Sequence, residues 1–515
     1  MRAKKKAIDI RTLFRLNSTG APLHRREDNP WCERLSQSFA LFILTLFPLL
    51  LSHDYYSKLT LFKFRLFTIS TVVYFILCFL ILIFHPGRQN RGLKRNPAKP
   101  RMTVPQIILL AYVLWAAISM WHSSYSGLWL GQRRYEGLLS ILLYATVFLL
   151  LSTWGEYTDA YTYGLGLMGT AVGFIAMLQT FGALIFYPIG FDYWNSSFLT
   201  TIGHEDCVAC LINILIPTLL SGFVILKSPW RWLGVPALFL MAYLTVYTDV
   251  DTAKLGIVTT VLLLPCLIES RERFRETLVA LIPIFLGAAL GFSYHRDRSF
   301  EPGALALAFL LAAAALGVAA WAMRKRKQTW SVAPAVIRRS SYAVLAVLLI
   351  VALVALYGYQ GDNRLVREFS ELLHGDLRDE AGSFRGYIWK CTWKIIGEHP
   401  VFGGGPGSFA SLFEPYNPGY QALLHDEIIV DFPHNDFLSV AACTGLVGLA
   451  LYLAFLIALA VRCIRAAFRC PVLLIFLGGM AGYLIYSFFV FSIAVVSPLF
   501  WVLAGLADKC VRQLE

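Results

Sequence analysis

Residues 431–455 read DFPHNDFLSVAACTGLVGLALYLAF and mark the point where a long polar segment gives way to a hydrophobic helix. On an ideal helix, which turns by ~100° per residue, Ala441, Gly445 and Gly448 fall within roughly 40° of His434. One stripe of this helix would therefore carry an imidazole at its outer end and small residues below it. Small residues let another helix come close inside a bilayer, so we expect helix packing at Gly445 and Gly448.

His434 is the first candidate for chemistry. In the first turn of a helix it would feel the positive end of the helix dipole, which disfavours the imidazolium form. A neutral imidazole can take a proton, so the pattern predicts a general base at the membrane surface. Asn435 or a nearby carboxylate would orient the ring. The alternative is a histidine that only marks the water interface.

The composition predicts a membrane protein. The chain has 515 residues, is 57% hydrophobic and contains many apolar runs long enough to cross a bilayer. We expect an all-α polytopic fold with about 12–14 transmembrane helices and one large extracytoplasmic loop. The apolar runs fall near residues 36–52, 66–84, 104–121, 137–154, 161–187, 207–226, 232–248, 255–268, 277–293, 303–323, 341–359, 435–461, 472–491 and 493–507. Ser492 to Pro498 is either a kink in one long helix or a tight turn between the last two runs.

Charge and cysteine content exclude several other classes. The net charge of +13 arises from Lys and Arg residues that mostly fall between the runs on one side of the membrane. By the positive-inside rule this side is the cytoplasm, where the N-terminus also lies, and nucleic acid is not needed to explain the charge. The ten Cys are scattered, show no metal spacing and suggest no disulfide framework. We therefore expect membrane lipids but no nucleic acid as partners, and neither a metal site nor a cofactor.

The domain organisation follows from these runs. It comprises a basic cytoplasmic leader (1–35), the first eleven transmembrane helices (36–359), a large extracytoplasmic loop (360–433), C-terminal transmembrane helices (434–508) and a cytoplasmic tail (509–515). A compact loop of this length usually carries function. Within it we expect a surface helix over 383–397, ended by His399-Pro400. The glycine run 403–407 lacks the Lys-Ser/Thr of a phosphate-binding loop and predicts a turn.

Charged residues at the outer ends of helices give further candidates. Arg133 and Arg134 run against the positive-inside bias, so they either bind an anionic ligand or pair with Glu136. His204 and Glu205 begin another span, where they could bind substrate or a cation, although helix capping by Glu205 or its neighbour Asp206 is the simpler interpretation.

Two more cations lie near this face. Lys254 sits between two spans with almost no loop, where a charge is costly and usually functional; the alternative is a pair with Asp251. Arg385 in the large loop offers the planar fork that suits phosphate oxygens, although an isolated arginine is more often an ion-pair residue.

The spacing His434-Asn435, nine residues, Gly445, two residues, Gly448 resembles the signature of the O-antigen ligase and O-antigen polymerase superfamily of bacterial membrane proteins. The resemblance is strong over about 383–455, and Arg134 to Gly137 and Gly203 to Glu205 resemble its weaker N-terminal landmarks. It implies a bacterial plasma (inner) membrane location with an extracytoplasmic active site. It also implies an undecaprenyl diphosphate-linked glycan as donor and an acceptor hydroxyl on a lipid, a glycan chain or a protein.

The resemblance also assigns roles. The family's catalytic histidine falls on His434, and its loop arginine, which holds the donor diphosphate, falls on Arg385. A second arginine of the family falls on Lys254, which keeps the charge but loses the bidentate fork. Arg134 could add a third cation. Such cations would stabilise the departing diphosphate without a metal, and a direct displacement would invert the anomeric centre.

Two other function classes remain open from the sequence. A lipid-linked glycan flippase or another transporter of the cell envelope would more often show charges deep within spans and paired broken helices. A scaffold for envelope synthesis gives no reason for outward cations beside His434. The sequence favours a glycosyltransferase but leaves open which glycan moves and whether the enzyme is a ligase or a polymerase.

Overall fold

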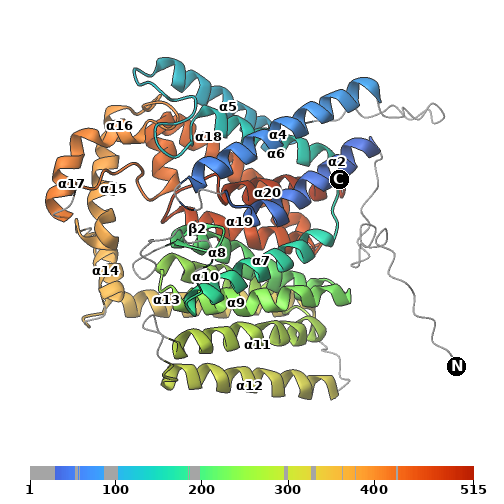
Figure 1. The fold of residues 1–515 in the computed structure, drawn as a ribbon. Coiled ribbons are helices and arrows are strands. Elements are labelled where there is room, and N and C mark those ends of the chain that lie inside the picture. Colours follow the sequence, from blue (N-terminus) through green and yellow to red (C-terminus); the bar gives the residue numbers. More distant parts are fainter. Residues whose placement is uncertain are drawn as a thin grey trace.

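The structure is a computed structural model that describes residues 29–52, 56, 58–85, 102–183, 185, 198–294, 300–325, 332–361, 364–376, 378–424 and 427–515. Its helices run side by side in one bundle, and α14 to α17 gather at one end of it (Figure 1). The C-terminus lies at the opposite end. Most of the predicted leader (1–35) lies outside the described residues.

The first half of the bundle follows the predicted apolar runs. It comprises α2 (Pro30–Leu41), the π-helix η1 (Phe42–Leu46), α3 (Phe47–Leu49), α4 (Leu59–Phe84), α5 (Val104–His122), α6 (Leu138–Trp154), α7 (Ala160–Thr180), α8 (Glu205–Ile225), the 3-10 helix η2 (Pro229–Gly234) and α9 (Val235–Tyr247). Two short antiparallel strands, β1 (Phe198–Leu199) and β2 (Gly203–His204), pair just before α8.

The second half contains residues 360–433, which are the predicted extracytoplasmic loop and are called the outer segment below, and the C-terminal helices. It comprises the 3-10 helix η3 (Asp251–Lys254), α10 (Leu255–Leu267), α11 (Arg271–Ser293), α12 (Ala304–Lys325), α13 (Pro334–Tyr357), α14 (Arg364–Leu373), α15 (Ala381–Glu398), α16 (Phe409–Phe413), the 3-10 helix η4 (Glu414–Tyr416), α17 (Asn417–Leu424), α18 (Asp436–Ala467), α19 (Leu473–Ser487) and α20 (Ser497–Arg512).

The fold is that of an all-α polytopic membrane protein. Among the described residues, eight helices are long and apolar enough to cross a membrane, namely α4, α5, α7, α8, α11, α12, α13 and α18. Other helices on predicted runs are shorter than the ~20 residues of a perpendicular span, α6 and α19 among them. The number of spans therefore stays a prediction, as does the side of the membrane that each end faces.

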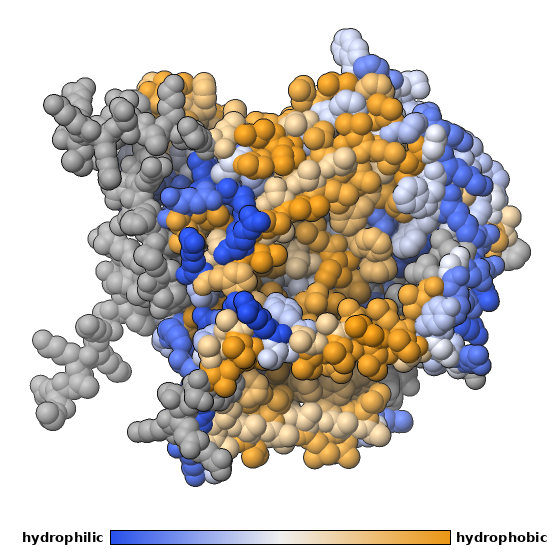
Figure 2. Space-filling model, turned by 180° about the vertical axis from the view of Figure 1, so that it is seen from behind, coloured by the Kyte–Doolittle hydropathy of each residue, from blue (hydrophilic) through white to orange (hydrophobic). Residues whose placement is uncertain are grey.

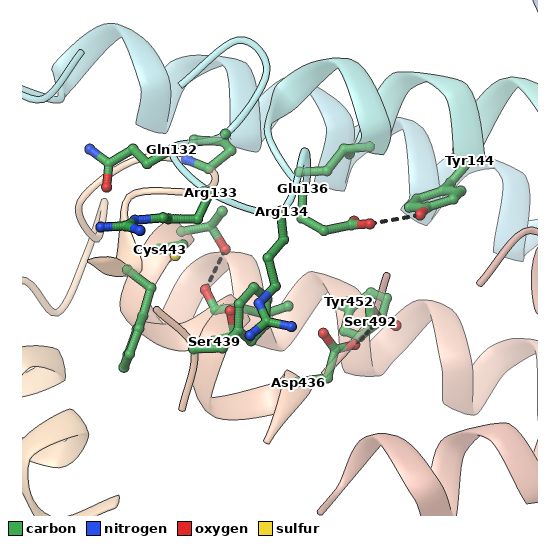
Figure 3. Close-up of a pocket in the computed structure, with 18 of the residues that line it drawn as sticks. Gln132, Arg133, Arg134, Glu136, Tyr144, Asp436, Ser439, Cys443, Tyr452 and Ser492 are labelled. Carbon is green, nitrogen blue, oxygen red and sulfur yellow. Dashed lines mark hydrogen bonds between the residues drawn. The ribbon is translucent and has the colours of Figure 1, made fainter. Parts of the chain in front are cut away.

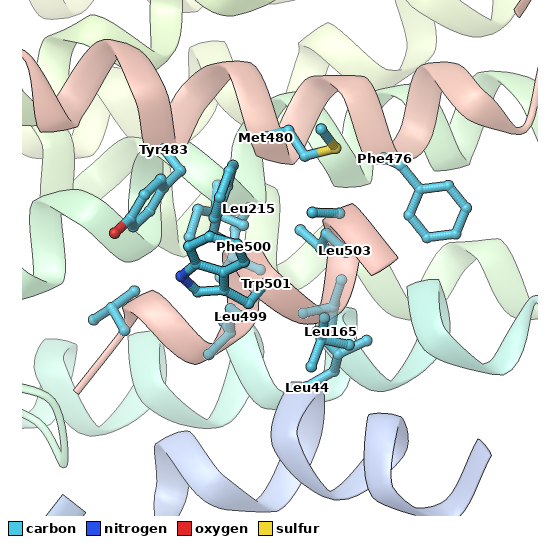
Figure 4. Close-up of a cluster of buried hydrophobic side chains, with 14 of the residues drawn as sticks. Leu44, Leu165, Leu215, Phe476, Met480, Tyr483, Leu499, Phe500, Trp501 and Leu503 are labelled. Atoms are coloured by element: carbon cyan, nitrogen blue, oxygen red, sulfur yellow. The ribbon is translucent and has the colours of Figure 1, made fainter. Parts of the chain in front are cut away.

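Helix α8 forms the centre of the bundle. Every residue from Cys207 to Ile225 is buried, as expected for a helix that is apolar on all sides. Its neighbours contribute large aromatic and aliphatic side chains to one continuous core, shown in part in Figure 4, where Leu215 of α8 lies near Met480 and Tyr483 of α19. Helix α13, in contrast, has no buried residue. Figure 2 shows the wide hydrophobic surface and a hollow within it, bordered by hydrophilic residues.

Two features position the C-terminal helices: a turn between α19 and α20, and a buried carboxylate near the end of α20. Residues 488–496 are irregular, so the last two runs form separate helices joined by a turn, and the alternative of one kinked helix is wrong. At the far end, the carboxylate of Asp508 is fully buried and accepts hydrogen bonds from Thr103 (3.1 Å) and Ser152, while Arg462 lies 3.4 Å away. Asp508 thus ties α20 to α5, α6 and α18.

The predicted surface helix in the outer segment is confirmed as α15. Gly382, Ser383 and Phe384 have left-handed backbone angles, so the regular helix begins at Arg385. It ends at Glu398, directly before the predicted stop at His399-Pro400.

Candidate active site

His434 stands outside α18 and not in its first turn, so this part of the sequence prediction is wrong. Its φ of 52° is left-handed, and the helix begins at Asp436. The physical reason is the cap: the side-chain oxygen of Asn435 accepts a hydrogen bond from the Leu438 N–H (2.9 Å). Asn435 is therefore used as the helix cap, and His434 projects from the turn that precedes it.

Arg385 reaches the same place from α15. Trp389, one turn further along that helix, donates its indole N–H to the carbonyl of Pro433 (2.9 Å). Residues four apart share one helix face, so this bond aims Arg385 at the turn that carries His434. Among the described residues, Arg385 forms no ion pair, although its charge acts on both His434 and Asp206. The site thus contains a partly buried guanidinium with no carboxylate bound to it.

Arg134 and an aromatic ring also lie close to His434. Arg134 forms two hydrogen bonds with Asp431, both 2.9 Å long, and not the pair with Glu136 that was one of the two alternatives from the sequence. Its guanidinium stacks over Phe491, 4.1 Å from the ring centre. The same ring meets His434 edge-on, with 5.6 Å between ring centres. Phe491 thus contacts both the imidazole of His434 and the guanidinium that pairs with Asp431.

The environment keeps His434 uncharged. Burial, and next the positive charge of Arg385, lower the pKa of His434 to about 4. The negative charges of Asp206 and Asp431 oppose this shift only in part. Among the described residues, the Nδ1 atom of His434 is buried without a hydrogen-bond partner. The neutral imidazole was predicted from the helix dipole, whereas the structure attributes it to burial and Arg385.

Gly445 does not pack against a helix, so this prediction also needs correction. Its φ of 72° and ψ of 176° break α18, and a Cβ at this position would lie 1.9 Å from the carbonyl oxygen of Val401. At the break the Gly404 and Gly405 N–H groups donate to the carbonyls of Ala442 (3.0 Å) and Cys443 (2.7 Å). The predicted turn at 403–407 thus fills the break in α18.

Further contacts fasten this junction to α5. Trp115 donates to the carbonyl of Thr444 (2.9 Å), and Ser119 donates to the carbonyl of Phe402 (2.6 Å). Gly448 lies in the same region, where a Cβ would come within 3.3 Å of the Trp115 ring. The outer segment that carries Arg385 is therefore fixed to the helix that follows His434.

A comparison of the sequence with known families bears on this site. Residues 304–453 match the family model described as O-antigen ligase, which covers less than a third of the chain. This part of the chain is similar to the O-antigen ligase family. This confirms the resemblance drawn from the sequence and supports a general role in glycan transfer. A comparison with curated proteins gives no match.

The matched region contains only part of the predicted site. Arg385, His434, Asn435, Gly445 and Gly448 lie within it, whereas Arg133, Arg134, Glu136, His204, Glu205 and Lys254 precede it. Arg134 lies outside the matched region, but it stacks on the Phe491 ring, which also contacts His434.

Lys254 and the start of α8 have local partners. The Lys254 ammonium donates to Asp251 (2.8 Å) and Asp249 (3.0 Å), which is the alternative that the sequence had left open. His204 is the cap of α8 because its Nδ1 accepts from the Asp206 N–H (3.2 Å). Capping was predicted here, but by Glu205 or Asp206.

A cavity of about 90 Å³ lies beneath the segment that carries Arg133, Arg134 and Glu136 (Figure 3). Tyr144 donates to the Glu136 carboxyl group (3.0 Å), and Ser492 donates to that of Asp436 (2.9 Å). Burial raises the pKa of Glu136 to about 8, although the hydrogen bond from Tyr144 opposes the shift. Both carboxyl groups belong to the cavity wall.

Sequence reasoning missed Asp431, Asp436 and Phe491. Asp431 and Asp436 flank His434, and their charge was the available signal. Phe491 lies in the irregular stretch between α19 and α20, where no local pattern points to His434.

Proposed function

We propose that this protein transfers a glycan from a polyprenyl diphosphate, such as undecaprenyl diphosphate, to an acceptor hydroxyl at the outer face of the membrane. The observation that carries the proposal is that the positive charge of Arg385 acts on the buried imidazole of His434, and both residues lie in the region that matches the O-antigen ligase family. A cation without a bound carboxylate suits an anionic leaving group. A neutral imidazole beside it suits a hydroxyl that must lose its proton.

The chemistry assigns one role to each group. The acceptor oxygen attacks the anomeric carbon, the bond from that carbon to the diphosphate oxygen breaks, and the diphosphate leaves with the electron pair. Arg385 stabilises the charge that develops on it. His434 takes the hydroxyl proton through Nε2, since Nδ1 is buried. Direct displacement inverts the anomeric centre.

Other predicted cations have smaller parts in this scheme. Arg134 is already neutralised by Asp431, so its role is to hold that carboxylate and Phe491 beside the imidazole. Lys254 is left out of the donor site because two carboxylates already bind its ammonium. Asn435 supports His434 as the cap of α18.

The test uses the purified protein in liposomes that contain a lipid-linked glycan. His434→Gln keeps the size and polarity of the side chain but removes the base, and it should lower the transfer rate ~10²–10⁴-fold. Arg385→Lys keeps the charge but loses the fork, and should weaken donor use. Arg378→Lys is the matched control, because Arg378 is exposed in the same outer segment and pairs with Glu371 (3.0 Å). Full transfer by His434→Gln would rule out the base.

A further inference from the structure

Helix α13 is open along most of its length. All but one of residues 343–355 are exposed and apolar, and no residue of the helix is buried. The helix is held near both ends. At one end Tyr342 donates to the Leu262 carbonyl of α10 (3.3 Å), and at the other the Tyr357 ring stacks on His374, with 4.0 Å between ring centres. The middle of α13 therefore presents an uncovered apolar face.

A groove runs beside this helix. Helix α10 packs against α13 and α19, and α19 packs against α18, so α10 and α19 form a floor between two ridges, α13 and α18. This groove accounts for the hollow in the hydrophobic surface that Figure 2 shows. The floor is apolar as well, because α10 exposes Ile257, Val258, Val261 and Leu262.

Helix α18 turns an apolar stripe towards α13. Ile457, Val461, Ile464 and Phe468 are exposed, and on a helix they fall within about 60° of one another. The Phe468 ring, directly after α18, lies 4.2 Å from the guanidinium of Arg338 on α13. The stripe that ends at Phe468 therefore faces α13, and Arg338 closes the groove at this end.

The closed end of the groove is strongly basic. Arg465 and Arg469 flank Phe468, and Arg339 follows Arg338 on α13. Arg338 is paired with a carboxylate in the turn between α10 and α11. The other three arginines are exposed, and in the part of the chain that the structure describes they form neither an ion pair nor a hydrogen bond. Three unpaired guanidinium groups thus stand at one end of an apolar groove.

We propose that the groove between α13 and α18 binds one anionic phospholipid, with its headgroup at the end of the bundle opposite the outer segment. The phosphate lies among Arg339, Arg465 and Arg469, because basic pockets between transmembrane helices suit anionic headgroups. An acyl chain lies along the α18 stripe. From 457 to 468 the helix rises about 16 Å, close to the ~15 Å of hydrocarbon in one leaflet. A polyprenyl chain is much longer than this stripe. The inference does not depend on the proposed function.

Native mass spectrometry of the purified full chain, released from detergent micelles, counts the lipids that stay bound. Palmitoyl-oleoyl phosphatidylglycerol is compared with phosphatidylcholine that has the same chains, and with undecaprenyl phosphate. We expect one phosphatidylglycerol per protein, bound at least about tenfold more tightly than phosphatidylcholine, because only the former has a net negative charge for the arginines. Undecaprenyl phosphate should bind more weakly than phosphatidylglycerol.

Two variants separate the headgroup from the chain. Arg339→Gln combined with Arg465→Gln should lower the affinity for phosphatidylglycerol about 25-fold, since one arginine near an anionic lipid contributes about fivefold. Val461→Trp fills the groove, keeps every arginine and should also abolish retention of the lipid. Arg34→Gln and Ile76→Trp are the matched controls, because Arg34 is exposed on α2 and Ile76 is exposed on α4.

The outcomes decide between this site and an unspecific basic surface. Loss of phosphatidylglycerol in the test variants, with retention in both controls, supports the site. Equal retention of phosphatidylcholine would overturn the inference, and so would retention of undecaprenyl phosphate as strong as that of phosphatidylglycerol. Unchanged retention in Val461→Trp would also overturn it, because the arginines would then act without the groove. This result stands even if the double arginine variant fails to insert into the membrane.

Discussion

Replacing Gly445 by alanine should detach the outer segment from α18. The backbone of Gly445 has φ 72° and ψ 176°, a region that essentially only glycine occupies and that costs another residue about 1–3 kcal/mol. The new Cβ would also lie 1.9 Å from the carbonyl oxygen of Val401, so the two backbones must separate. Gly445→Ala therefore acts on the junction itself.

The size of the effect follows from the hydrogen bonds across that junction. Separation would break the bonds from Leu446 to Pro400 (2.8 Å) and from Gly405 to Cys443 (2.7 Å). Each contributes about 0.5–1.5 kcal/mol, so the total cost, including backbone strain, is about 2–6 kcal/mol. A loss of about 3 kcal/mol corresponds to roughly a hundredfold faster exchange of the protected amides.

Hydrogen exchange read by mass spectrometry on the purified protein measures this directly. The amides of Gly404, Gly405 and Leu446 should exchange faster in Gly445→Ala, and glycan transfer should fall with them. Gly397→Ala is the matched control, because a Cβ on Gly397 meets open space in α15. It should be neutral or stabilise by up to about 1 kcal/mol. Unchanged exchange at Gly404 and Gly405 in Gly445→Ala would refute the junction as the support of the outer segment.

Two other contacts give expected outcomes. Asp508→Asn removes the buried charge next to Arg462 and should lower the free energy of unfolding by about 3 kcal/mol. Glu515→Gln alters the exposed partner of Arg462 and should change the free energy of unfolding by less than about 1 kcal/mol. Thermal melting in detergent compares the two variants, and equal melting points would contradict the role of Asp508. Trp389→Phe keeps the ring but loses the bond to the Pro433 carbonyl, so kcat should fall while the donor KM stays the same, and unchanged kinetics would show that the turn at His434 is held by other contacts.

The helices could be predicted from the sequence because their signals are local. Long apolar runs gave the bundle, and the helix stop at His399-Pro400 gave α15. The break at Gly445 could not be found in this way, since helical periodicity assumes an uninterrupted helix. The break exists because Gly404 and Gly405, forty residues earlier, supply donors for the freed carbonyls. Such competition between distant backbone groups leaves no mark in a local pattern.

The site was predictable only in part for the same reason. Arg385 and His434 were linked by the resemblance to a family and not by spacing. A pair between Arg134 and Glu136 was one of two alternatives drawn from the sequence, because proximity in sequence was the available guide. The structure instead pairs Arg134 with Asp431, almost three hundred residues away. Ion pairs at a site depend on tertiary placement, which the sequence does not display.

In the proposed function, the charges around His434 would connect donor binding to proton transfer. In the free protein, burial and then Arg385 lower the pKa of His434 to about 4, which makes the imidazole a weak base. A diphosphate bound to Arg385 would offset that positive charge and raise the pKa of His434 towards its ordinary value of 6.5. The base would thus gain strength only when the donor is in place, which protects the site from premature chemistry.

This coupling predicts two different acid limits for the reaction. Activity falls when the base becomes protonated, so it is lost as the pH drops below the pKa of His434. The plot of kcat/KM for the donor reports the free protein and should fall near pH 4, whereas kcat reports the complex and should fall at a higher pH. In Arg385→Gln the cation is absent from both the free protein and the complex, so both acid limits should shift to higher pH. Coincident limits in the unaltered protein would show that the donor charge does not reach His434, because the electrostatic coupling requires them to differ.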